Sequence, residues 1–170
     1  TIKYRSVKLG KSTKTRELST HFTVEAHPDS ILAYLRIPEK HMQWNKGVKK
    51  VRILKQDSAY WITHTMYNIP FPISQQDVVV KNVVVRTENK LVINITSTPN
   101  FTPPIKGIDR VKHYIAQWVI IPLENNKVDV TFSAITLSKS YIPKFIKDPL
   151  IQNNLLKSVK AFKLILTQNK

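Results

Sequence analysis

Alternation of apolar and polar residues with period two predicts that most of this chain is β-strand. In the segment 16–26, every second residue belongs to one apolar face, made of Leu18, Thr20, Phe22, Val24 and Ala26. A first strand is expected at 2–9, and another follows the turn at Gly47. The pattern predicts further strands at 59–67, 78–86, 91–97, 111–123 and 128–137.

Helical periodicity occurs in two places. A short helix is expected after His27, where Pro28 suits the first turn, and it ends before Pro38. The second helix is expected to begin at Asp148-Pro149 and to run towards the end of the chain. Its apolar stripe has the spacing i, i+4, i+7 and i+11 and consists of Leu155, Val159, Phe162 and Leu166.

The order of these elements predicts an α+β fold. A single amphipathic helix that follows many antiparallel strands buries its apolar stripe most readily by lying across the concave face of the sheet. We therefore expect a helix-grip arrangement, in which a curved antiparallel β-sheet wraps around a long C-terminal α-helix. Two proline-rich loops, 68–76 and 98–107, interrupt the strands.

Composition narrows the class of protein. The chain has 170 residues, the size of one ordinary domain, and 42% of them are hydrophobic, so a real core is expected. Cysteine is absent, which excludes disulfides, a thiol nucleophile and cysteine-based metal centres. No apolar run is long enough to span a bilayer.

The charge is strongly positive, with 27 Lys and Arg against 11 Asp and Glu, a net charge of +16. This balance favours anionic partners such as acidic lipid head groups. The simpler interpretation is a soluble surface covered with lysine. The basic residues are spread along the chain and form no block interleaved with aromatic residues, so nucleic-acid binding is not expected.

Four collinear stretches resemble a known family. They are "IKYRSV" near the start, "PFPISQQDVVV" from Pro70, "KGIDRVKHYIAQWVIIPL" from Lys106 and "VDVTFSAITLSKSYIPKFI" from Val128. Their order and motifs resemble the START (lipid-transfer-protein-related) domain, and the short bacterial START-like proteins of the helix-grip, polyketide cyclase-like superfamily above all. Gln75-Gln76 replaces an Asp-Arg pair of the family signature, and 137–140 replaces an Asp-Pro-Gly-Gly turn. Residues 1–170 are expected to form a single START-like domain in which the family's N-terminal helix is missing before Thr1.

The resemblance implies an apolar cavity between sheet and helix that binds, and in some relatives transfers, a lipid or another hydrophobic small molecule. Strand alternation and the helical stripe suggest its lining: Tyr60, Ile62, His64, Met66, Asn82, Arg110, Tyr114, Trp118, Leu155, Val159 and Phe162. An arginine buried on a strand needs an anionic or polar partner. For Arg110, an internal ion pair with Asp77 is favoured over direct contact with the ligand. A β-bulge near Lys112 would reverse the face on which Arg110 lies.

The loop 68–76 has two interpretations. Pro70 and Pro72 stiffen it, while Ile69, Phe71 and Ile73 offer an apolar rim. In the family's arrangement this loop lies beside the cavity mouth, which suggests a lid through which a lipid tail passes. The alternative is a packed connector in which the side chain of Phe71 fills a gap in the core.

Catalysis is not expected. Motifs of hydrolases, nucleotide-binding proteins and metalloproteases are absent, and the five histidines lack the spacing of metal ligands, so we expect no catalytic residue, metal or cofactor. The alternative enzyme is a cyclase or aromatase that uses His64 or Tyr114 to move a proton in the same cavity. A third hypothesis is an interaction domain whose cavity is closed by bulky side chains.

The expected partners follow from the same resemblance and from charge. Besides the lipid, we expect a transient contact with an anionic membrane surface through basic residues of the C-terminal helix, namely Lys144, Lys147, Lys157, Lys160 and Lys163. The chain is expected to be a monomer. Its compartment stays open between the bacterial cytoplasm and, if a signal peptide preceded Thr1, the periplasm or the exterior.

Overall fold

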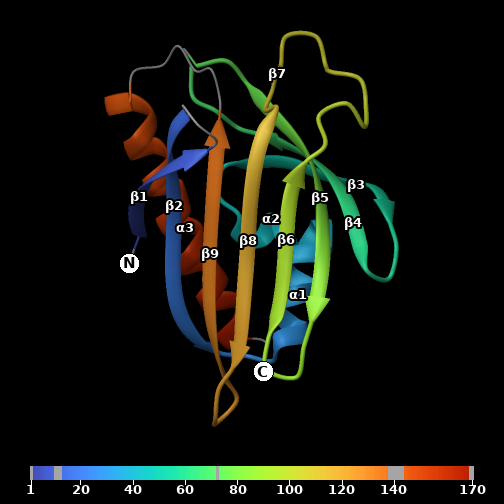
Figure 1. The fold of residues 1–170 in the computed structure, drawn as a ribbon, viewed down its shortest axis with the longest axis vertical. Helices are drawn as coiled ribbons and strands as arrows, with labels where there is room; N and C mark the ends of the chain where they lie inside the picture. The colour runs from blue at the N-terminus through green and yellow to red at the C-terminus, as the bar shows by residue number, and fades with distance from the viewer. Residues whose placement is uncertain (1, 10–12, 72, 138–143, 169–170) are drawn as a thin grey trace.

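A computed structural model describes residues 2–9, 13–71, 73–137 and 144–168. Strands and helices follow the α+β order expected from the sequence (Figure 1). The elements are β1 (Ile2–Leu9), β2 (Thr13–Glu25), α1 (Pro28–Arg36), α2 (Pro38–Trp44), β3 (Val48–Gln56), β4 (Tyr60–Tyr67), β5 (Gln76–Arg86), β6 (Leu91–Ser97), β7 (Asp109–Arg110), β8 (His113–Pro122), β9 (Lys127–Leu137) and α3 (Lys144–Gln168).

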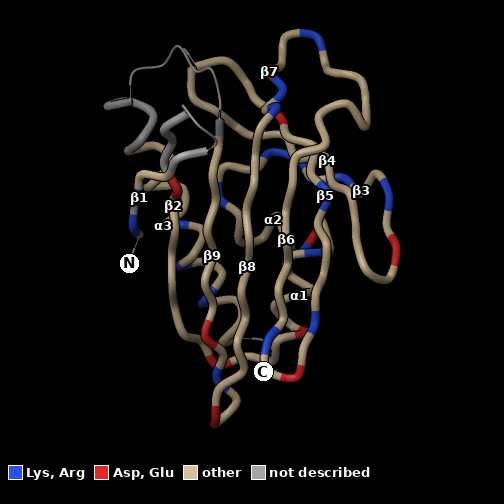
Figure 2. The backbone as a smooth tube through the Cα atoms, viewed as in Figure 1, with Lys and Arg blue, Asp and Glu red and all other residues tan. Residues whose placement is uncertain are grey.

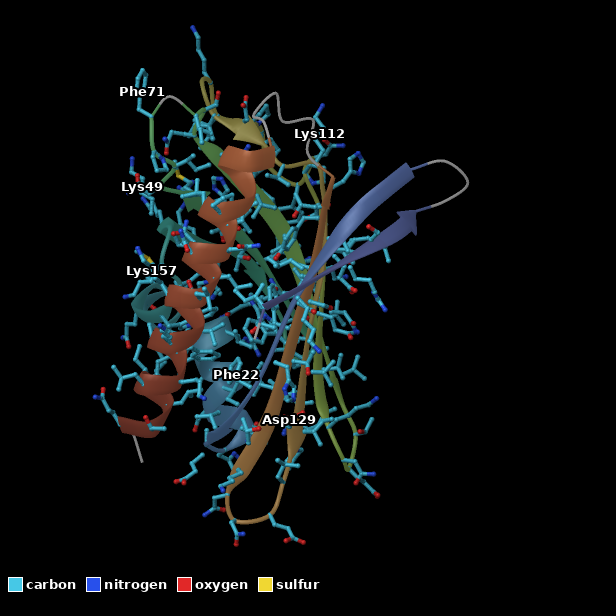
Figure 3. The ribbon with its side chains drawn as sticks, turned by 90° about the vertical axis from the view of Figure 1, so that its left-hand side faces the viewer. Phe22, Lys49, Phe71, Lys112, Asp129 and Lys157 are labelled. Atoms are coloured by element: carbon cyan, nitrogen blue, oxygen red, sulfur yellow. The ribbon has the colours of Figure 1, made fainter. Side chains whose placement is uncertain are left out.

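The strands form one curved sheet in the order β1-β2-β9-β8-β6-β5-β4-β3. Neighbouring strands along this path are antiparallel, and the short β7 adds a parallel pairing to β5. The three helices lie on the same, inner face of the sheet, and α3 runs along its length (Figures 1 and 3). The predicted helix-grip fold is therefore confirmed.

The core lies between this inner face and α3. Cross-strand pairs such as Ile93–Trp118 and Val130–Phe22 place aliphatic and aromatic side chains side by side on the inner face. The face of β2 predicted from the alternation of Phe22 and Val24 is the buried one. Burial of these side chains supplies most of the driving force for folding.

Two helix boundaries differ from the sequence-based prediction. The predicted loop after Pro38 contains α2, because Pro38 ends α1 and also occupies the first turn of the next helix, where proline needs no N–H partner. Ile37, in extended conformation, joins the two helices. The second difference is that α3 begins at Lys144, so Pro149 lies inside the helix and not at its start. None of the helices in the described ranges is both long and apolar enough to cross a membrane.

Candidate ligand-binding site

We call the half of the molecule nearer the start of α3 the upper half and the half nearer its end the lower half. Aromatic rings fill the lower half of the space between the sheet and α3. Phe162 of α3 is fully buried, and it stacks on Trp44 of α2 with ring centroids 4.5 Å apart. Trp118 meets the edge of Phe162 at 6.0 Å and Phe132 at 4.5 Å, and Tyr34 and Phe22 approach from α1 and β2. Phe162 and Trp118, both predicted to line a cavity, therefore lie in the packed floor of the grip.

The upper half of the inner face has a different composition. The register of β4 with β5 places Thr63 beside Val80 and Thr65 beside Val78 on the side that faces α3. We call the set Thr63, Thr65, Tyr67, Val80, Asn82 and Tyr114 the upper inner face. Val159 of α3 is partly buried against the core, and the predicted lining residue Leu155 is also partly buried. Every side chain of this set is neutral.

Two tyrosines of the upper inner face stand out by their hydroxyl groups. Tyr67 ends β4, Tyr114 lies near the start of β8, and both pack against the core cluster while keeping some accessible surface. Burial raises the pKa of Tyr67 to about 12. Burial also raises the pKa of Tyr114 far above its usual value, with a smaller contribution from the nearby Tyr67. Both phenols therefore stay protonated at neutral pH.

Neither tyrosine hydroxyl has a hydrogen-bond partner within the described residues. In this part of the chain, Thr98 Oγ1 is the one fully buried side-chain polar atom without a partner. The hydroxyls of Tyr67 and Tyr114 are thus in contact with space that water can enter, although surrounding atoms desolvate them enough to shift their pKa. Polar groups in such a position are available to a ligand.

The remaining predicted residues of β4 lie on the other face of the sheet. The register pairs His64 with Val79, Ile62 with Lys81 and Met66 with Asp77, opposite to Thr63, Thr65 and Tyr67. The prediction that Tyr60, Ile62, His64 and Met66 face the helix was therefore wrong. Residues 61–65 are buried on both faces, so the strand shows no alternation from which its inner face is recognisable.

Arg110 also lies on the outer face, because the strand is irregular near Lys112, as considered in the sequence analysis. The predicted continuous strand is broken at Val111 and Lys112, between β7 and β8. Arg110 is paired with Asp77, whereas Val111 is a buried core residue and Tyr114 points inward. Because of this irregularity, Arg110 and Tyr114 belong to opposite faces.

The favoured ion pair between Arg110 and Asp77 is present. Arg110 Nε donates to Asp77 Oδ1 at 2.6 Å and Arg110 Nη2 donates to Asp77 Oδ2 at 2.9 Å. The other three N–H groups donate to the backbone carbonyls of Pro99, Thr102 and Pro103, at 2.7, 3.1 and 3.3 Å. A guanidinium has five N–H groups, so all of them are used to fasten the proline-rich loop 98–108 to the sheet.

His64 extends this arrangement. Its Nε2 lies 2.7 Å from Asp77 Oδ2 and its Nδ1 lies 3.2 Å from Arg52 Nη2. The neutral tautomer with a proton on Nε2 satisfies both contacts, because arginine can only donate. Burial alone would raise the pKa of Asp77, but hydrogen bonds from Arg110 and His64 outweigh burial and hold the pKa below its usual value. We call Arg52, His64, Asp77 and Arg110 the outer ion network.

Asn82 is the predicted residue of β5 that does face inward. It is buried, and its Nδ2 donates to the carbonyl of Trp61 at 3.2 Å. Sequence reasoning missed Thr63, Thr65 and Tyr67, which occupy the inner positions first assigned to their neighbours. No group of three or more potential metal ligands occurs in the ranges that the structure describes.

The loop 68–76 is closed on itself by one side chain. Gln75 Nε2 donates to the carbonyl of Ile69 at 2.6 Å, and Gln75 Oε1 accepts from the N–H of Ile69 at 3.2 Å. Phe71, at the tip, is 96% exposed and points away from the molecule near the upper end of α3 (Figure 3). The alternative in which Phe71 fills a gap in the core is therefore wrong.

Where the loop leaves β4, it is tied to the turn before β3. Asn68 N–H donates to the carbonyl of Gly47 at 2.8 Å. Gly47 has φ +106°, and a Cβ there would approach Asn154 of α3 to 3.0 Å. On the same helix Ser158 Oγ accepts from the N–H of Lys46 at 2.9 Å. These contacts connect the base of the loop to α3.

The exposed lysines of α3 and two open grooves lie outside the upper inner face. Lysines 157, 160 and 163 are exposed on α3, and the side chains of Lys144 and Lys147 lie outside the described part. Along the backbone, β6 and β8 carry no Lys, Arg, Asp or Glu (Figure 2). One groove of about 540 Å³ lies between the α1–α2 joint and β3, and another of about 430 Å³ lies by the start of α1. Neither groove is lined by the upper inner face.

Comparison with known sequences gives little information. None of the protein-family profiles matches the chain. An uncharacterized protein of Pseudomonas aeruginosa is 24% identical over 122 residues, which are 71% of this chain and 60% of that protein. The chain thus spans about 60% of the length of this curated relative.

Solved structures are much more informative. A STAR-related lipid transfer protein of Xanthomonas axonopodis superposes with a TM-score of 0.81 at 20% identity, covering 96% of this chain and 98% of that one. Human StAR-related lipid transfer protein 5 has a TM-score of 0.77 at 15% identity, covering 97% and 86%. An aromatase/cyclase of Streptomyces has a TM-score of 0.61 at 13% identity, covering 86% and 90%. The chain therefore has the START-type helix-grip fold.

Proposed function

We propose that this chain binds a lipid or another hydrophobic small molecule between the upper inner face and α3, without catalysis. The observation that supports this most is the pair of desolvated tyrosine hydroxyls that contact accessible space above a packed aromatic floor. Burial of an acyl chain there contributes about 0.8 kcal/mol per methylene group. The proposal treats residues 1–170 as one START-like domain, and the similar structures named for lipid transfer agree with it.

Exchange of the ligand with a membrane is the second part of the proposal. Phe71 is fully available to enter an apolar phase, and its loop is tied through Gly47 and Lys46 to α3. Exposed Lys157, Lys160 and Lys163 supply positive charge on α3 for docking to anionic lipid. Ile69, Phe71 and Ile73 then act as the rim of a lid that opens on the membrane surface.

The test is native mass spectrometry of protein purified from cells, followed by denaturing extraction of bound molecules. We expect a co-purifying mass of lipid size, or uptake of a fluorescent lipid by the empty protein. A protein that is empty and takes up no lipid from a panel would contradict the proposal and favour the closed, interaction-domain alternative. Flotation with anionic vesicles tests docking separately, and binding should weaken as salt rises.

The cyclase-like alternative has lost one of its two candidate residues. His64 lies on the outer face, and both of its ring nitrogens are engaged by Asp77 and Arg52. Tyr114 stays on the inner face, where its raised pKa makes it a hydrogen-bond donor and a poor base at neutral pH. The similarity to an aromatase/cyclase structure concerns the fold and leaves the chemistry open.

A further inference from the structure

We infer that the bound molecule has a neutral polar group, a hydroxyl or a carbonyl of an ester or ketone, which forms hydrogen bonds with Tyr67 and Tyr114. Ligands that end in a carboxylate or a phosphate are discriminated against. This inference rests on the proposed function, because it names the chemical class of the molecule that occupies the same site.

The first argument concerns the two phenols. Tyr67 reaches the site from the end of β4 and Tyr114 from the start of β8, so each of these two strands supplies one hydroxyl group. Neither hydroxyl has a partner in the described part of the chain, yet both have accessible surface. A phenolic hydroxyl can donate one hydrogen bond and accept another. The pair therefore matches a ligand group that is itself neutral and hydrogen-bonding.

The second argument is that none of the described side chains of the upper inner face is a cation. Among the described side chains, the upper inner face consists of Thr63, Thr65, Tyr67, Val80, Asn82 and Tyr114, and none is charged. Arg110, which was predicted to line the cavity with an internal ion pair to Asp77 favoured over contact with the ligand, lies on the outer face. All five of its N–H groups are used there, by Asp77 and by three carbonyls.

Electrostatics then decides between ligand classes. An ionised carboxylate that leaves water for this site would lose its hydration and meet no opposite charge among the described side chains of the upper inner face, which is strongly unfavourable. A hydroxyl or ester carbonyl loses less hydration, and the two phenols replace its bonds to water. The raised pKa of both tyrosines agrees with this picture, since the surroundings disfavour a negative charge.

The decisive experiment is a competition between two probes with the same acyl chain. Protein freed of bound lipid is incubated at pH 8 with equal amounts of 1-monopalmitoylglycerol, which is neutral, and palmitate, which is ionised. Native mass spectrometry then counts the occupancy of each. We expect the neutral lipid to be bound at least about tenfold more tightly, the size of effect that hydrogen bonds to otherwise unpaired groups produce.

Variants assign this preference to the phenols. The double substitution Tyr67→Phe with Tyr114→Phe should weaken binding of monopalmitoylglycerol about tenfold and leave palmitate unchanged. Tyr60→Phe is the matched control, because it removes the same atom from the same strand on the outer face, where Tyr60 packs beneath Lys55 and Lys81. Affinity for both probes should be unaffected in this control.

Each outcome decides something different. If the protein binds both probes equally, or palmitate more tightly, the inference is wrong while the proposed function stands. If it binds neither probe nor any other lipid, the proposed function itself is contradicted. If the double variant keeps the preference, the tyrosines are not the recognising groups. Should the double variant fail to fold in a thermal melt, the competition on the unaltered protein still decides the head-group class.

Discussion

The two faces of β4 use polar side chains in opposite ways. On the outer face, His64 belongs to the outer ion network, in which Arg110 has used every N–H group and Asp77 accepts from two neighbours. On the inner face, Thr63 and Thr65, which flank His64, and Tyr67 are neutral, and the hydroxyl of Tyr67 has no partner in the described part of the chain. Adjacent residues of one strand therefore serve different purposes.

This difference separates structural polar groups from available ones. Removing a group from a fully satisfied buried network leaves its former partners unpaired, so such groups govern stability. Removing a hydroxyl that has no protein partner leaves nothing unpaired, so its effect should appear in ligand binding. Burial of Arg110 already favoured an ion pair within the protein, and its five hydrogen bonds to Asp77 and to three carbonyls assign it to the fold.

The largest effect is expected from Arg110→Ala. This change leaves the carboxylate of Asp77 buried with His64 as its remaining partner and frees three carbonyls of the loop 98–108. Loss of one partner of a buried ion pair costs about 3–5 kcal/mol, which urea unfolding would measure. Arg52→Ala, at the exposed end of the network, should cost less than about 1 kcal/mol. Equal effects of the two changes would contradict the assignment of stability to the buried Arg110–Asp77 pair.

The pH dependence of the unfolding free energy should distinguish the outer ion network from a second titratable site, His41 of α2. Burial lowers the pKa of His41 from 6.5 to about 4, against the opposing effect of its contact with the Leu35 carbonyl. The unfolded chain therefore takes up this proton first. Stability that is present above pH 6.5 is lost as the pH falls towards 4, by at most roughly 3 kcal/mol.

Asp77 should act in a lower pH window. Its pKa lies below the usual 3.8, so its contribution is present above that pH and is lost as the pH falls further, through the pKa of the folded state. Unfolding free energies measured from pH 8 to pH 3 check both windows. His41→Gln should flatten the pH dependence above pH 4, and Asp77→Asn should flatten it below. A variant whose profile stays parallel to that of the unaltered protein would show that its residue does not carry the effect.

A smaller effect on stability is expected on the inner face. Tyr114→Phe and Tyr67→Phe each remove a hydroxyl without a partner among the described residues, so the free energy of unfolding should change by less than about 0.5 kcal/mol. Chemical denaturation of the empty protein measures this. A loss above about 1 kcal/mol would mean that the hydroxyl is part of the fold after all, and the contrast between the faces would fail.

The smallest effect on stability is expected at the loop tip. Phe71→Asp should leave unfolding unchanged, because the ring is 96% exposed. Transfer of a fluorescent lipid between vesicles should nevertheless become several-fold slower, since the charge opposes entry into the membrane. Phe101→Asp, on the other proline-rich loop with its ring 47% exposed, is the matched control and should transfer normally. Unchanged lipid transfer by the Phe71 variant would contradict the proposed role of this loop as a lid.

Local pattern determined much of the fold. Period-two alternation located the strands, and the stripe from Leu155 to Leu166 located α3, because each pattern requires one apolar face and one solvated face. The Arg110–Asp77 ion pair also followed from the sequence, since a buried arginine needs an anion. The second helix was missed because Pro38 was interpreted only as a helix terminator, although Glu39 in its first turn is a signal that the sequence contains.

The identity of the site residues was decided by tertiary structure. On β4 the alternation vanishes, because the core lies against one face and the outer ion network includes His64 on the other, so five consecutive residues are buried. Between β7 and β8, the irregularity at Val111 and Lys112 reverses the pleat, and the sequence raised this bulge only as an alternative, because no local propensity decides whether it forms. The sequence by itself therefore determined which elements form and that they grip a helix. Which tyrosines, threonines and charges face that helix depends on contacts between segments far apart in the chain, and these exist only once the sheet has closed around it.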